Sequence, residues 1–179
     1  MKLERSETMM TKSAASPRPT RRQVTLERTF KAPLQDVWEL WTTKAGIESW
    51  WGPDGFRVEV ERIELRPGGE LHYSMITTGA EQIEYMKKAG MPLTTRCRAT
   101  YTEVTPMTRV AYLHVADFIP GVEPYDVAHA IELFPSGDGV RMLLRIEAMH
   151  DDHWTGQAVA GWENELDTLA KVLAGGKKL

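Results

Sequence analysis

The spacing of apolar residues changes along the chain, and these changes predict its elements. Residues 23 to 30 alternate between apolar and polar with a period of two, which is typical of a strand. After Pro33, apolar residues recur at the i, i+3, i+4 and i+7 positions of a helix packed on a core: Leu34, Val37, Trp38 and Trp41. A second short helix follows and ends at Gly52-Pro53. We expect only one of the adjacent Trp50 and Trp51 to point inward.

From residue 56 onward the pattern is that of strands separated by turns. We predict strands over residues 56 to 65, 69 to 78, 94 to 105, 108 to 118, 124 to 135 and 139 to 149. Strands that follow one another at this spacing favour an antiparallel meander. The first of them changes parity between Val60 and Ile63, which indicates a β-bulge near Glu61 and Arg62.

Two further segments complete the pattern. Residues 79 to 93 are too long for a hairpin turn, so we expect an excursion that acts as a lid over the edge or mouth of the sheet. Residues 151 to 174 predict a long amphipathic helix, with Asp151 or Asp152 as its N-cap and Gly175 after its end. The sheet must receive the apolar stripe of this helix, which consists of Trp154, Ala158, Trp162, Leu166, Leu169 and Leu173.

Length, charge and cysteine content exclude several classes of protein. The 179 residues suit one domain, which we place at residues 23 to 176. Residues 1 to 22 contain six basic and two acidic residues and no apolar period, so we expect a disordered basic arm. The net charge of -3 does not favour a nucleic-acid partner, and no segment is apolar enough for membrane insertion. The single cysteine, Cys97, favours the cytoplasm.

Three ordered segments carry a resemblance to a known family: RTFKAPLQDVWELWTTKAGIESWWGP from residue 28, IELRPGGELHYSM from residue 63 and HDDHWTGQAVAGWENELDTLAKVL from residue 150. They resemble the SRPBCC superfamily of START and birch-pollen-allergen relatives, in the branch homologous to the C-terminal domain of the activator of heat-shock-protein ATPase. The resemblance implies an α+β helix-grip fold, in which a curved antiparallel sheet of about seven strands wraps a long C-terminal helix. It also implies a hydrophobic pocket used for ligand binding.

The uncharged face of each predicted strand should turn toward the last helix and line this pocket. For the strand over residues 108 to 118 the pattern does not decide which face turns inward, because both faces are apolar enough to line the pocket. The opposite faces, which include Arg145 and Glu147, should be exposed. Apolar walls with a few polar groups are typical of a small-molecule site and also of a filled core. The candidate ligand-binding residues are Phe56, Tyr73, Met75, Cys97, Tyr101, His129, Ile131, Met142, Leu144, Trp154, Ala158 and Trp162.

His129 is the strongest candidate for chemistry. A buried imidazole can orient a ligand or act as a general acid or base, or it can be satisfied by Tyr73, Tyr101 or the backbone. The acidic residues are expected to point outward, so nothing supports a hydrolytic triad. Residues 150 to 153 lack a third convergent ligand, and we expect neither a metal nor a cofactor.

These features lead to three hypotheses about function. The first is a binding protein, monomer or homodimer, that holds a small apolar or aromatic molecule between the sheet and the last helix. The second is a cyclase or hydrolase-type enzyme that uses His129 as acid or base. The third is a co-chaperone-like interaction module with a chaperone partner, which predicts an exposed apolar patch. The resemblance also raises the expectation of a stress-related role.

Overall fold

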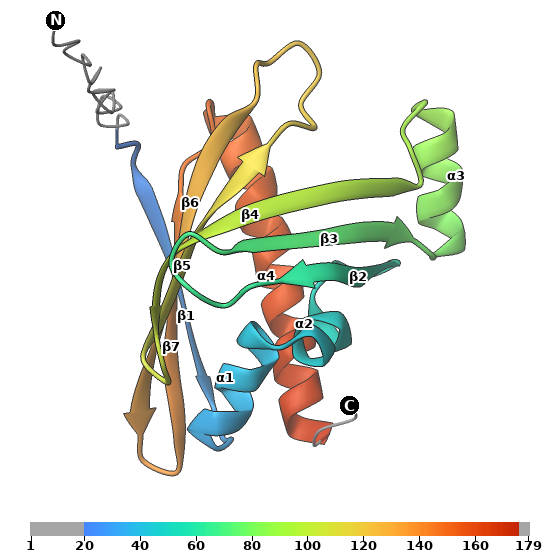
Figure 1. The fold of residues 1–179 in the computed structure, drawn as a ribbon. Coiled ribbons are helices and arrows are strands. Elements are labelled where there is room, and N and C mark those ends of the chain that lie inside the picture. Colours follow the sequence, from blue (N-terminus) through green and yellow to red (C-terminus); the bar gives the residue numbers. More distant parts are fainter. Residues whose placement is uncertain (1–19, 176–179) are drawn as a thin grey trace, which may run out of the picture.

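A single curved antiparallel sheet organises the computed structural model, which describes residues 20–175 (Figure 1). Its strand order is β1-β7-β6-β5-β4-β3-β2. Strands β2 to β7 form a meander, and β1 pairs with β7 at one edge of the sheet. The strands are β1 (Gln23–Phe30), β2 (Phe56–Ile63), β3 (Glu70–Thr77), β4 (Thr94–Thr105), β5 (Arg109–Ala116), β6 (Tyr125–Ser136) and β7 (Gly139–Glu147). The helices are α1 (Leu34–Thr42), α2 (Lys44–Trp50), α3 (Ala80–Lys88) and α4 (Asp152–Gly175).

This architecture confirms the expected α+β fold and its order of elements. The pairing of β2 with β3 shifts between Val60 and Arg62, where the parity change indicated a bulge. A second shift, between Tyr101 and Glu103 on β4, leaves no comparable trace in the sequence. Bulges increase local twist and bend the strand, and the sheet therefore curves toward α4 (Figure 1).

Helix α4 lies along the concave side of the sheet (Figure 1). Asp151 caps it, since its carboxylate accepts a hydrogen bond from the Trp154 N–H at 2.7 Å. The Thr155 hydroxyl accepts one from the Met149 N–H at 3.0 Å, which ties the first turn to the end of β7. Leu166 and Leu169 are fully buried, as the stripe requires. Among residues 20–175, no helix is long and apolar enough to cross a membrane.

The prediction that only one of Trp50 and Trp51 points inward is wrong, because both are buried. Helix α2 ends at Trp50, and Trp51 already has extended backbone angles. The helical period therefore no longer separates the two side chains. Together with Trp41 and Trp162 they form a tryptophan cluster, in which Trp41 stacks on Trp162 with ring centres 5.9 Å apart and Trp50 stacks on Trp51 at 5.8 Å.

The segment over residues 79 to 93 contains α3, which extends from the far ends of β3 and β4 (Figure 1). A Cβ on Gly55 or on Gly79 would meet the side chain of Gln82, so both glycines let α3 sit close against the start of β2. None of the segment's residues lines the cavity described below. The segment is therefore an excursion at the edge of the sheet, one of the two places expected for it, and a role as a lid stays a prediction.

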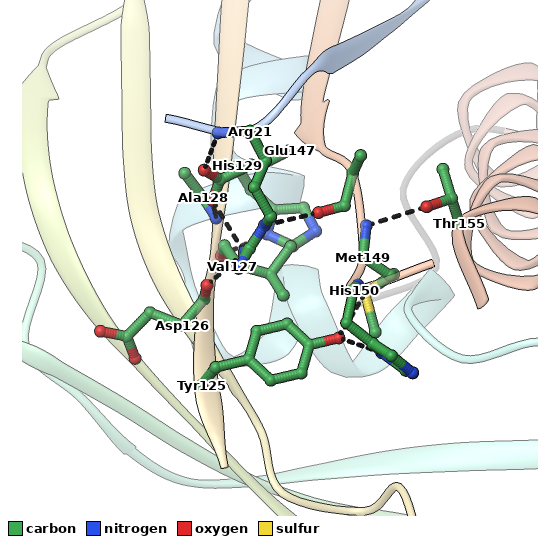
Figure 2. Close-up of polar contacts among 11 residues, drawn as sticks. Arg21, Tyr125, Asp126, Val127, Ala128, His129, Glu147, Met149, His150 and Thr155 are labelled. Carbon is green, nitrogen blue, oxygen red and sulfur yellow. Dashed lines mark hydrogen bonds and ion pairs between the residues drawn. The ribbon is translucent and has the colours of Figure 1, made fainter. Parts of the chain in front are cut away.

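The expected solvent face contains one buried acid, Glu147, which is 2% exposed. Its carboxylate accepts hydrogen bonds from the Arg21 N–H, the Arg21 guanidinium and the Ala128 N–H, each at 3.1 Å (Figure 2). The same guanidinium donates to the backbone oxygens of Ala148 and Asp126 at 2.8 and 2.6 Å. Arg21 was assigned to the basic arm, but it belongs to the folded domain. Residues 1–19 of that arm lie outside the described residues.

We predict that Arg21→Ala lowers the free energy of unfolding by about 2 to 3 kcal/mol, because a buried carboxylate then loses its guanidinium. Urea denaturation at pH 7 measures this change. The matched control is Arg22→Ala, since Arg22 pairs with Asp152 in an ion pair whose side chains are 63% and 98% exposed. That variant should stay within about 0.5 kcal/mol of the wild type. Equal effects of the two substitutions would contradict a structural role for Arg21.

Candidate functional site

A cavity of about 370 Å³ lies between α4 and the concave face of the sheet. Its walls come mainly from β3, β5, β6 and α4, with Trp51 and Pro53 contributed by the segment after α2. The lining is mostly apolar and contains five titratable side chains, Tyr73, Tyr112, His114, His129 and Glu165. No Lys or Arg lines it, within the described part of the chain.

The structure brings together half of the candidate ligand-binding residues at this cavity. Those that line it are Tyr73, Met75, His129, Trp154, Ala158 and Trp162. Those that do not are Phe56, Cys97, Tyr101, Ile131, Met142 and Leu144. Of the second group, Ile131, Met142 and Leu144 are fully buried in the hydrophobic core. Phe56 and Cys97 are half-buried near the outer strands, and burial raises the pKa of the Cys97 thiol to about 11.

Strand β5, whose inward face the sequence left open, turns Tyr112, His114 and Ala116 toward the cavity. The Tyr73 hydroxyl and the His114 Nε2 are 3.1 Å apart and share a hydrogen bond. Burial lowers the pKa of His114 to about 4, so the imidazole is neutral at pH 7. The Tyr112 hydroxyl is buried and has no hydrogen-bond partner in the described chain.

His129 is held from two sides. Its Nδ1 lies 3.1 Å from the Val127 carbonyl oxygen, and its ring stacks on Tyr112 with centres 5.1 Å apart. Burial, aided by the nearby His114, lowers its pKa to about 3. The ring is therefore neutral at pH 7, the Nδ1–H donates to Val127, and Nε2 keeps its lone pair as an acceptor.

Glu165 contradicts the expectation that the acidic residues point outward. It is 7% exposed and lines the cavity from α4. Burial raises its pKa to about 8, against the opposing effect of the Gly52 N–H, so the carboxyl is mostly protonated at pH 7. Its spacing could have revealed it, since it lies three residues after Trp162 and four before Leu169, on the buried stripe.

The exposed end of the cavity is flanked by two aromatic rings. Phe118, which follows β5, and Trp154 on α4 meet edge to face with ring centres 6.0 Å apart. Close to this rim the Tyr125 hydroxyl hydrogen-bonds the His150 Nδ1 at 2.9 Å (Figure 2). Among residues 20–175, no group of three His, Cys, Asp or Glu side chains is arranged to hold a metal ion.

The protonation of Glu165 predicts how stability depends on pH. Because its folded-state pKa of about 8 exceeds the ordinary value of 4.5, its contribution is fully present below pH 4.5 and is lost as pH rises through 8. Glu165→Gln should therefore gain on the order of 4 kcal/mol over the wild type between pH 5 and pH 9. Urea denaturation across this range checks the value. The control Glu163→Gln removes a half-exposed carboxyl of the same helix that pairs with Arg28, so it should stay within about 1 kcal/mol of the wild type. A Glu165→Gln variant that also keeps a constant difference from the wild type across this range would refute the assignment.

Comparisons with known proteins place the chain in a family. The family model of the Activator of Hsp90 ATPase homolog 1-like protein matches residues 31–174. A search of curated proteins found no match.

Solved structures share the fold at low sequence identity. Protein CV1439 from Chromobacterium violaceum is 22% identical, with a TM-score of 0.69 over 84% of this chain and 96% of that one. The AHSA1 protein from Silicibacter pomeroyi is 20% identical, with a TM-score of 0.68 over 86% and 98%. The AHSA1-like protein from Aeromonas hydrophila is 20% identical, with a TM-score of 0.67 over 87% and 94%. The chain therefore belongs to the Activator of Hsp90 ATPase homolog 1-like family and has the helix-grip fold of the SRPBCC superfamily.

Proposed function

We propose that the protein binds a small apolar or aromatic molecule in the cavity between α4 and the sheet. The observation that carries this proposal is the cavity itself, about 370 Å³ in volume and walled mainly by apolar and aromatic side chains. Ligand pockets in proteins occupy about 300 to 1,000 Å³ and combine such walls with a few placed polar groups. His129 and Tyr73, expected to orient the ligand, both lie at this cavity.

Burial of apolar surface would supply most of the affinity. A two-ring aromatic molecule loses roughly 200 Å² of apolar surface, which at about 25 cal/mol per Å² stabilises the complex by about 5 kcal/mol. Stacking on the cavity's rings and one or two hydrogen bonds add a few kcal/mol. After the cost of immobilising the ligand, a dissociation constant on the order of micromolar is expected.

The two alternative functions have less support. An acid–base role for His129 requires a proton affinity suited to neutral pH, whereas burial lowers its pKa to about 3. An interaction module requires a continuous exposed apolar patch. The exposed large apolar side chains of the described residues instead lie on several elements: Leu65 after β2, Tyr85 and Met91 in the segment that contains α3, Phe118 after β5 and Phe134 on β6.

Ligand binding is tested with the neutral probe 1-naphthylmethanol. A saturating concentration, about 100 times Kd, should raise the melting temperature by roughly 5 °C. Gly161→Leu should reduce the affinity at least about tenfold, because a side chain added at this lining position meets no protein atom within 4 Å and enters the cavity. Calorimetric titration measures both affinities.

The matched control is Gly156→Leu on the same helix. Gly156 is exposed, lies outside the cavity lining and also has no atom within 4 Å of an added Cβ. Both substitutions remove a helical glycine and should leave the helix at least as stable. Unchanged affinity in Gly161→Leu, or equal loss in both variants, would place the binding elsewhere.

A further inference from the structure

Four aromatic rings that line the cavity lie close to one another. Trp51 is central, and its ring centre lies 5.5 Å from that of Tyr73, 6.2 Å from that of Tyr112 and 5.7 Å from that of Trp162. All four side chains line the cavity. The rings come from the segment after α2, from β3, from β5 and from α4, so independent elements converge on one place. The faces of such rings carry partial negative charge and attract cations.

Glu165 lines the cavity beside these four rings, which we call the aromatic cage. It follows Trp162 by about one helical turn, and its carboxyl interacts electrostatically with both Tyr73 and Tyr112. It is more than nine-tenths buried and lines the cavity. Among the described residues, the backbone N–H of Gly52 is the one group that favours its charged form. A buried carboxylate is costly unless a cation accompanies it.

No other charge in the cavity wall can serve as that cation. Both histidines are neutral at pH 7, because burial lowers the pKa of His114 to about 4 and that of His129 to about 3. The remaining titratable groups that face Glu165 are the hydroxyls of Tyr73 and Tyr112 and the Cys97 thiol, and burial raises the pKa of each. An anionic ligand would therefore find no counterion, whereas a cationic ligand would find both a carboxylate and aromatic faces.

We propose that the ligand is an organic ammonium ion with an apolar body, whose cationic head lies against Glu165 inside the cage of Trp51, Tyr73, Tyr112 and Trp162. This inference rests on the proposed binding function and assigns the chemical class of the ligand. The apolar body extends toward Phe118 and Trp154 at the rim. Glu165 determines specificity by its charge, and the rings contribute by attracting the ammonium group to their negatively charged faces.

Binding of such a cation has a consequence that can be measured. Before binding, the carboxyl of Glu165 is protonated at pH 7, because burial raises its pKa to about 8. An ammonium ion beside it stabilises the carboxylate and lowers that pKa, so the proton leaves to solvent. Close to one proton should be released per ligand bound at pH 7.

The experiment compares three probes that share a naphthalene ring: 1-naphthylmethylamine, 1-naphthylmethanol and 1-naphthoate. Each is titrated into the full chain at pH 7 by calorimetry, in two buffers of different ionisation enthalpy. The amine should bind about tenfold more tightly than the alcohol and release nearly one proton, whereas the alcohol should release none. The carboxylate should bind most weakly.

Glu165→Gln keeps the shape of the side chain and removes its charge. In this variant the amine should lose its advantage over the alcohol and its proton release, while the affinity for the alcohol changes less than about threefold. The control Glu163→Gln removes a half-exposed carboxyl that pairs with Arg28 and lies outside the cavity lining, so it should bind the three probes as the wild type does. The comparison of the amine with the alcohol in the wild-type protein tests the proposal even if neither variant folds.

The outcomes separate the ligand class from the binding function. If the alcohol binds at least as tightly as the amine, or if Glu165→Gln keeps the preference for the amine, the ammonium assignment is overturned and the proposed binding function stands. If none of the three probes binds, both are overturned. Tighter binding of the amine with release of a proton, lost together in Glu165→Gln, supports the assignment.

Discussion

The arrangement of the cavity depends on the packing of four tryptophans. Trp41 from α1, Trp50 and Trp51 from the end of α2, and Trp162 from α4 lie in mutual contact, with the Trp41 and Trp50 rings 4.7 Å apart. This cluster sets where α2 ends and which face of α4 turns inward. Gly52 then bends the chain at a positive φ of 120° toward β2. The positions of Trp51 and Glu165 at the cavity follow from the same contacts.

Two buried glutamates show how differently the same side chain can be accommodated. Glu147 receives a guanidinium and two backbone N–H groups from within the chain, so it is held as part of the structure. Glu165 receives little from the protein, and burial raises its pKa accordingly. Loss of a partner from the first arrangement would destabilise the fold, because it would leave a buried charge uncompensated. The second leaves a carboxyl group whose charged form the protein does not stabilise and a ligand can. Buried titratable groups with raised pKa values tend to mark functional sites for this reason.

The sequence predicted the fold better than the site, for physical reasons. Strand and helix periods depend on which faces are buried, so alternation located the meander and the stripe of α4 within a few residues. Parity alone could not orient β5, because Ala111 and Tyr112 both suit an interior. The assumption that acidic residues point outward also excluded Glu165 from the predicted site, although its position in the helix falls on the buried apolar stripe. The depth of each residue along the curved sheet, which separates Tyr73 from Tyr101, depends on bulges and tertiary packing.

Helix α3 stands apart from all of this. It projects beyond the ends of β3 and β4, lines no part of the cavity and exposes 68% of Tyr85. Its sequence is consequently constrained by local helix formation, by the burial of Met86 and by the close approach at Gly55 and Gly79, and not by a ligand in the cavity. This separation makes the tip of the β3–β4 hairpin a modular attachment point, where a reporter or an immobilisation tag can be fused without altering the chemistry of the core.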